Sequence, residues 1–188
     1  MSTSGHDAKV PVRVVRVTDA SGRTRISVTI GVESFLEAPE HYRHQLEKFK
    51  RAYKHLVNQA LRIKKETKGA RKGNALSYWR LGKLLYDFKS STDSEFVLTN
   101  HLEAFQRDLG ITDSQVGILV DFARFFKQDE VDPSVPMSYY WELLLKARRS
   151  QSIGKLSEAK QELVELVSRK EVADHKSYRK RLNELLKN

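Results

Sequence analysis

Apolar residues recur every three or four positions over most of this 188-residue chain, which predicts a mainly α-helical, multi-helix bundle. The spacing predicts a long helix from about Glu40 to Lys68, with Pro39 suited to its first turn. Shorter helices are expected over residues 76–88 and, after a polar loop over Lys89–Ser94, from Glu95 with Ser94 as its cap. Another is expected over residues 139–147, with Ser138 as its cap and a basic connector over Arg148–Gly154 after it. Trp79 and Trp141 are expected to be core residues and not platforms on which bases stack. Two more are expected near the C-terminus, around Leu156–Val167 and Tyr178–Leu186. The fold class expected from this pattern is therefore mainly α.

The N-terminal part has a different pattern, because apolar residues alternate with polar ones on either side of the turn-like Asp19–Gly22. This predicts a β-hairpin within residues 10–36, after a disordered stretch at 1–9. One face is expected to be apolar, with Val12, Val14, Val17, Ile26, Val28 and Ile30. The other is expected to be basic and polar, with Arg13, Arg16, Arg23, Thr24 and Arg25. A lone hairpin is marginal in water, so it either covers the helical core or pairs with another chain, for instance in a homodimer.

Residues 102–126 are predicted to form two helices joined by a tight turn at Leu109-Gly110-Ile111. Thr112 is placed to cap the second helix, and Gln115 completes the spacing of a capping box. The apolar face of that helix comprises Val116, Leu119, Val120, Ala123 and Phe126. The arrangement is that of a helix-turn-helix, a motif common in DNA-binding proteins. It is equally compatible with a packing unit of an all-α protein.

Positive charge is concentrated in one segment of the chain. The net charge is +10, and residues 41–73 alone hold eleven basic against two acidic side chains. Residues 74–147 hold seven basic against eleven acidic side chains, and residues 148–188 hold eleven against six. The chain thus divides into a long basic helix with its loop at 37–73 and a helical domain at 74–188.

A helix that only needs solubility would mix both signs, so the basic excess favours an anionic partner. We expect phosphate contacts from Arg43, Lys50, Arg51, Lys54, Arg62, Lys64, Lys65, Lys68, Arg71 and Lys72. A basic surface without a ligand and an acidic protein partner are the alternatives. A membrane surface is disfavoured, because the apolar stripe of this helix is spaced for core packing.

No catalytic constellation is evident, and no cofactor, metal site or enzymatic activity is expected. The chain has no Cys, and His41, His44 and His55 lack metal-site spacing with a carboxylate. Glu66-Thr67-Lys68 and Glu158-Ala159-Lys160 match the Glu-x-Lys of PD-(D/E)xK nucleases, but on predicted helices rather than strands. No apolar run is long enough to span a membrane, and a signal peptide is not evident. A cytoplasmic or nucleoid-associated protein is expected.

Two resemblances concern the second half of the chain. From about Leu76 to Leu186 it resembles a helical domain found in bacteria ahead of PD-(D/E)xK nuclease domains, through Tyr78-Trp79-Arg80-Leu81-Gly82-Lys83, Leu102-x-x-Phe105, Pro136-Met137-Ser138-Tyr139-Tyr140 and Glu142-Leu143-Leu144. The segment from Gly110 to Val116 also resembles the helix-turn-helix of ParB-type partition proteins. Both resemblances imply DNA binding. The nuclease half has no counterpart, so nuclease activity is not implied.

These observations together predict a non-enzymatic protein that binds nucleic acid, with duplex DNA as the expected partner. The basic helix and loop would hold phosphates, while Ser114, Gln115 and Arg124 would face a groove. Asp113 and Asp121 lie on the same helix and would be repelled by phosphates, so the basic segment is expected to matter more. A helical assembly protein that binds a protein partner and an RNA-binding protein are the alternatives.

Overall fold

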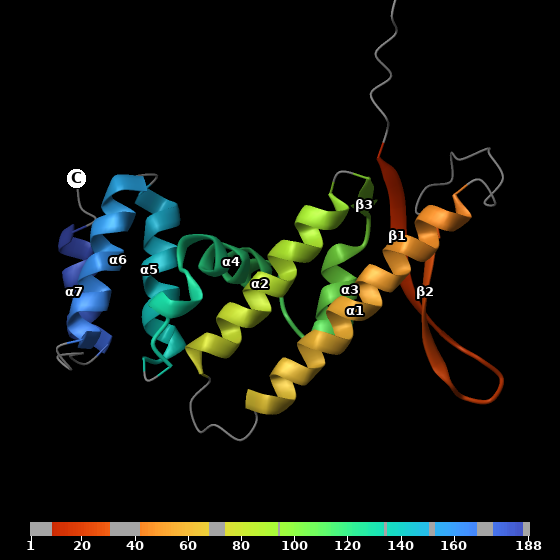
Figure 1. Ribbon diagram of the computed structural model, residues 1–188, viewed down its shortest axis with the longest axis horizontal. Coiled ribbons are helices and arrows are strands. Elements are labelled where there is room, and N and C mark those ends of the chain that lie inside the picture. The colour runs from red at the N-terminus through yellow and green to blue at the C-terminus, as the bar shows by residue number, and fades with distance from the viewer. Residues whose placement is uncertain are drawn as a thin grey trace, which may run out of the picture. The chain divides into compact units, whose positions relative to one another are not determined.

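The computed structural model describes residues 9–30, 42–67, 74–93, 95–133, 135–150, 153–168 and 175–185. This part of the chain is mainly helical, with an N-terminal β-hairpin in a small sheet, so the predicted fold class is confirmed (Figure 1). The elements are β1 (Val10–Thr18), β2 (Thr24–Ile30), α1 (Arg43–Thr67), α2 (Ala75–Thr92), β3 (Phe96–Leu98), α3 (His101–Leu109), α4 (Asp113–Phe125), the 3-10 helix η1 (Gln128–Glu130), α5 (Met137–Ser150), α6 (Ile153–Ser168) and α7 (His175–Leu185). The predicted disorder of residues 1–9 concerns positions that, apart from Lys9, lie outside the described residues.

The chain divides into two compact units that share helices α1 and α2. The first unit takes the chain up to Arg62 and residues 84–113, and so contains the sheet, most of α1 and α3. The second unit takes residues 63–83 and everything from Ser114 onward. The division falls between Asp113 and Ser114, so the two helices of the predicted helix-turn-helix belong to different units.

The sheet of the first unit has the strand order β2-β1-β3. Strands β1 and β2 are antiparallel, with a register that runs from Val12 opposite Ile30 to Thr18 opposite Thr24. Strand β3 is parallel to β1 and pairs Phe96 with Val10. The sequence predicted a helix from Glu95 here, which is wrong. Phe96-Val97-Leu98 instead forms a short strand along β1, and the helix begins at His101.

The predicted faces of the hairpin need a correction at three positions. One is Thr24, which lies opposite Thr18 and so on the face of Val14, not on that of Arg25. Because the register is regular, Val12, Val14 and Arg16 point to one face, while Arg13 and Val17 point to the other. Val12 and Val14 are fully buried, whereas Val17 is 39% exposed. A strand without a bulge cannot place Val14 and Val17 on the same face. Arg16 lies on the face of Val12 and Val14, but it is exposed.

Aromatic rings from several elements form the core of the first unit. Phe49 and Tyr53 of α1 stack at a centroid distance of 6.3 Å, and Phe49 meets Phe96 of β3 edge-on at 5.1 Å. Tyr53 stacks on Phe105 of α3 at 6.3 Å, and Phe88 of α2 contacts the same group. The aromatic stripe of α1 is thus a buried face, as its spacing predicted.

The second unit has its own core. Trp79 of α2 is 8% exposed and belongs to a cluster with residues of α4, α5, α6 and α7. Phe122, Phe126 and Tyr140 contact one another at 5.0–5.3 Å between ring centroids. The expectation that Trp79 is a core residue is confirmed, and Trp141 packs against the same cluster while partly buried.

Several element boundaries differ from those predicted. Helix α2 continues to Thr92, although a polar loop was expected from Lys89, because Thr92 is buried and its hydroxyl donates to the Phe88 carbonyl (2.7 Å). Helix α5 begins at Met137, so Ser138 lies in its first turn and is not its cap. Helix α5 also reaches Ser150, where a connector had been expected. The end of the predicted hairpin segment and the start of the predicted long helix fall on residues 31–41, and the predicted basic loop falls on residues 68–73. Both ranges lie outside the described part of the chain.

Candidate nucleic-acid interface

Helix α1 has a buried face and an exposed basic face. Phe49, Tyr53, Leu56, Val57 and Ala60 are at most 3% exposed and lie on one side of the helix. The opposite side carries a row of cations. With about 100° of rotation per residue, four exposed basic residues fall within a sector of roughly 80°, and they are Arg51, Lys54, Arg62 and Lys65. The structure therefore brings these four predicted phosphate contacts onto one face.

The other predicted contacts on α1 are placed differently. Arg43 is exposed at the first residue of the helix. Lys50 is half-buried, and its ammonium pairs with Glu47 (2.7 Å). The hydrogen bond from Lys50, and further cations nearby, lower the pKa of Glu47. Lys64 is half-buried too, and burial lowers its pKa. Lys50 and Lys64 are thus less available to a ligand than the exposed row.

Lys68, Arg71 and Lys72, the predicted contacts of the basic loop, lie outside the described residues. Lys48 is exposed on the same side of α1 as the basic row, but it pairs with Glu95 (2.5 Å). The two lysines in the last turn of α1, Lys64 and Lys65, also have a structural role. Positive charge at a helix C-terminus interacts favourably with the helix dipole, with or without a ligand.

Helix α4, the predicted recognition helix, offers little free surface. Val116, Ile118, Leu119 and Phe122 are buried, and only three of its residues are exposed, namely Asp113, Ser114 and Arg124. Gln115 is half-buried and lies about 100° around the helix from Ser114. The exposed residues therefore include an acid as well as a base.

Backbone contacts within the second unit hold α4 in place. A Cβ atom added to Gly82 of α2 would lie 2.0 Å from the Leu119 carbonyl oxygen, so the two helices cross at a distance that only glycine permits. The indole nitrogen of Trp79 donates to the Phe126 carbonyl (2.7 Å). Lys160 of α6 donates to the Phe125 carbonyl (2.9 Å) and to Glu130 (2.5 Å). Lys160, the lysine of the tripeptide that resembles the Glu-x-Lys of nucleases, thus caps the C-terminal end of α4.

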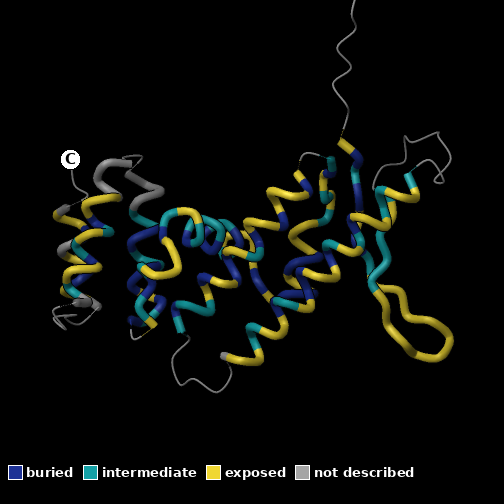
Figure 2. Tube along the Cα trace, in the orientation of Figure 1, coloured by how far each residue is buried: buried dark blue, intermediate teal, exposed yellow. Residues whose placement is uncertain are grey.

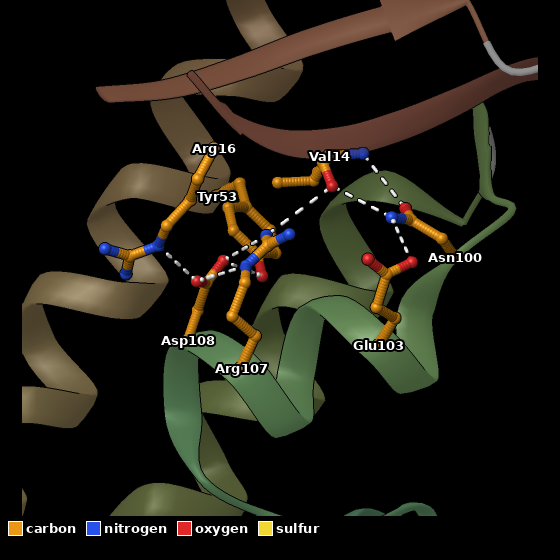
Figure 3. Close-up of polar contacts among 7 residues, drawn as sticks. All are labelled: Val14, Arg16, Tyr53, Asn100, Glu103, Arg107 and Asp108. Carbon is orange, nitrogen blue, oxygen red and sulfur yellow. Dashed lines mark hydrogen bonds and ion pairs between the residues drawn. The ribbon is translucent and has the colours of Figure 1, made fainter. Parts of the chain in front are cut away.

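A buried carboxylate connects the hairpin to helices α1 and α3 (Figure 3). The side chain of Asp108 is 0% exposed and accepts hydrogen bonds from Arg16 (2.7 Å), from both Nε and Nη2 of Arg107 (2.8 Å) and from the Tyr53 hydroxyl (2.9 Å). Burial raises the pKa of Asp108, but the bonds from Arg107, Arg16 and Tyr53 outweigh it and lower the pKa to about 2. Burial and the neighbouring carboxylate raise the pKa of Tyr53. The carboxylate stays ionised and holds β1, α1 and α3 together.

Asn100 makes a second connection at the same place. Its side-chain amide accepts from the Val14 N–H (3.0 Å) and donates to the Val14 carbonyl (2.8 Å), as a neighbouring strand would (Figure 3). The Asn100 side chain is engaged there and makes no cap on α3. Asn100 and Asp108 together fix the inner half of the hairpin.

The second unit also contains a pocket of about 370 Å³. The pocket is lined by three acidic residues and by apolar and aromatic ones, namely Asp129, Glu130, Val131, Asp132, Pro133, Tyr140, Leu163 and Val164. Lys160 is paired with Glu130, and this bond acts against burial to lower the pKa of Glu130. Since carboxylates repel phosphate, this pocket is unsuited to a nucleic-acid backbone.

The sequence did not single out the Asp108 cluster, although a signal was present. Ala104, Phe105 and Leu109 are the apolar face of α3, and Asp108 falls within that face by its spacing. An acid at such a position needs buried partners, and arginines are the best ones. What could not be predicted is that one of them, Arg16, comes from a strand 92 residues earlier.

Comparison of the chain with models of protein families, with curated proteins and with solved structures gives no match. The resemblances to the nuclease-associated helical domain and to the partition proteins therefore remain predictions. Over the described ranges, no helix is both long and apolar enough to cross a membrane. In the same ranges, no group of three or more His, Asp or Glu side chains is placed to hold a metal ion.

Proposed function

We propose that this chain binds duplex DNA without catalysing a reaction, and that the exposed row on α1 supplies the main phosphate contacts. The observation that carries the proposal is that Arg51, Lys54, Arg62 and Lys65 share one exposed face, opposite a buried apolar face. From Arg51 to Arg62 the row extends about 16 Å along the helix axis. Each strand of DNA presents a phosphate about every 3.4 Å of its axis, so several can be neutralised at once.

The helix-turn-helix segment takes a lesser part in this proposal. Ser114 and Arg124 are exposed on α4 and can add hydrogen bonds, while Asp113 opposes them. Lys68, Arg71 and Lys72 follow α1 in the sequence and remain predicted phosphate contacts. A cytoplasmic or nucleoid-associated location follows from the same role.

The salt dependence of binding tests this function. A labelled duplex of about 30 base pairs is titrated with the protein at several salt concentrations, and the slope of log affinity against log salt is measured. Six to eight phosphate contacts predict a slope of roughly −5 to −7. A slope near zero, or no binding at about 100 mM salt, would overturn the proposal. Competition with duplex RNA distinguishes the DNA partner from the RNA alternative.

A protein partner is the second candidate, and one observation favours it. Strand β2 lies at the edge of the sheet, with Ile26, Val28 and Ile30 half-buried on the inner face. An open edge with apolar side chains can pair with a second copy of the chain. Light scattering over a range of protein concentrations tests it. A defined dimer together with no binding to DNA would favour this function over the first.

A further inference from the structure

Past Arg16, whose guanidinium bonds Asp108 of α3, the outer half of the hairpin is exposed to solvent. Every residue from Arg16 to Arg25 is exposed, whereas Val10, Val12 and Val14 nearer the start of β1 are buried (Figure 2). Both faces of the two-stranded ribbon are therefore open to solvent over this length. A hairpin that only covered a core would have one buried face throughout.

The tip of the ribbon is nevertheless well ordered by its own bonds. The Asp19 carboxylate accepts hydrogen bonds from the Ser21 N–H (3.0 Å), the Ser21 hydroxyl (2.6 Å) and the Arg23 N–H (3.0 Å). These bonds, the hydroxyl's foremost, lower the pKa of Asp19, so the turn keeps its acceptor ionised. Gly22 has φ 79°, which a glycine adopts without strain. A pre-ordered turn loses little conformational entropy when it binds.

The base of the ribbon is fixed as firmly as its tip. Arg16, the first residue of the free part, is bonded to the buried Asp108, and Asn100 holds both backbone groups of Val14. The direction in which the ribbon leaves the unit is therefore set by charged and amide bonds. The ribbon is thus fixed at its base, ordered at its turn and exposed between the two. We call this segment, residues 16–25, the arm.

The chemistry of the arm suits an anionic partner. Arg23 and Arg25 are exposed, and within the described ranges neither guanidinium pairs with a carboxylate. The one acid of the arm, Asp19, is occupied by the turn. The facing hydroxyls of Thr18 and Thr24, 3.1 Å apart, add groups that can donate or accept hydrogen bonds.

We infer that the arm, residues 16–25, enters the major groove of duplex DNA, with Arg23 and Arg25 bonding phosphates or base edges. This inference rests on the proposed function and assigns a second contact beside α1. Each side of the arm has five residues, its half of the turn included, and so reaches at most roughly 16 Å from the base. The major groove of B-DNA is about 12 Å wide and about 8.5 Å deep, and it admits a two-stranded ribbon. The deep, narrow major groove of duplex RNA does not admit it.

The test uses the full chain and a labelled 30-base-pair duplex containing guanines. The double variant Arg23→Ala/Arg25→Ala is compared with Lys89→Ala/Lys127→Ala, which removes two exposed cations elsewhere. Binding is measured by anisotropy at several salt concentrations, and methylation of guanine N7 by dimethyl sulfate reports on the major groove. We expect the arm variant to lose about tenfold in affinity and to reduce the salt slope by up to about 2. It should also lose a protection of N7 that the wild type and the lysine control show.

The outcomes separate this inference from the proposed function. If the wild type binds duplex DNA and the arm variant matches it in affinity, slope and N7 protection, the arm assignment is overturned while DNA binding stands. If the wild type does not bind duplex DNA, both fall. An equal loss of affinity for single-stranded DNA, or a dimer that the arm variant abolishes without changing DNA binding, would also overturn the groove assignment.

Discussion

Helices α1 and α4 were both expected to hold nucleic acid, and they differ in how much of their circumference is left to solvent. Helix α1 uses one side for its aromatic core and leaves the opposite side exposed and basic. Helix α4 is packed on most sides and exposes Asp113, Ser114 and Arg124 only. A helix can bind a long polyanion with an exposed face, but not with a few scattered side chains. The comparison favours α1 as the binding element and α4 as a structural one.

The largest effect is expected at the crossing that holds α4. Gly82→Ala places a Cβ 2.0 Å from the Leu119 carbonyl oxygen, which is backbone and cannot move aside alone. Overpacking of this kind costs about 3 kcal/mol or more of unfolding free energy. Urea denaturation measures it. The control is Gly22→Ala, which meets no atom within 4 Å and whose cost is the strain of φ 79° alone, about 1–2 kcal/mol. Equal stability of Gly82→Ala and wild type would mean that α4 is not packed in this way.

Next in size is the removal of the basic row on α1, by the quadruple change Arg51→Ala, Lys54→Ala, Arg62→Ala and Lys65→Ala. We expect about a hundredfold loss of duplex affinity near 100 mM salt and a salt slope reduced by about 3 to 4. Asn58→Ala, an uncharged change on the same exposed face, should bind as the wild type does. Helical content from circular dichroism shows whether the quadruple variant is folded. A folded variant with wild-type affinity would reverse the comparison.

Acid should weaken the first unit through Asp108. Its folded pKa of about 2 lies below the ordinary value of 3.8, so its bonds stabilise the fold above about pH 4 and are lost as the pH falls toward 2. The loss amounts to on the order of 2 kcal/mol. Asp108→Asn lacks this titration, so its unfolding free energy should fall less between pH 4 and pH 2. Parallel pH profiles of variant and wild type would show that the cluster does not contribute.

The smallest effect is expected on the exposed side of α4. Ser114→Ala, Gln115→Ala and Arg124→Ala combined should change duplex affinity less than about threefold, because few of these groups can reach a groove together. A panel of duplexes with different sequences is the right measurement. A loss above tenfold that depends on the DNA sequence would restore α4 as the element that reads bases.

The helices and the hairpin were predictable because they depend on local spacing, as the aromatic stripe of α1 and the alternation in β1 show. Strand β3 was not, because three residues carry no period and its parallel partner lies more than 80 residues earlier. The basic row was predictable in composition, but the half-buried position of Lys50 and Lys64 depends on packing. The Asp108 cluster depends on three distant elements, which no local pattern can connect.

The amide of Asn100 has a consequence for how far the sheet can grow. On one side the sheet ends in the three-residue strand β3, and beyond it the Asn100 side chain occupies the Val14 groups that an incoming strand would need. Within the described residues, no strand pairs with the outer edge of β2, which is longer than the edge that β3 offers. Two copies that pair through β2 across a twofold axis would use this edge in both. Self-association through β2 would therefore give a pair.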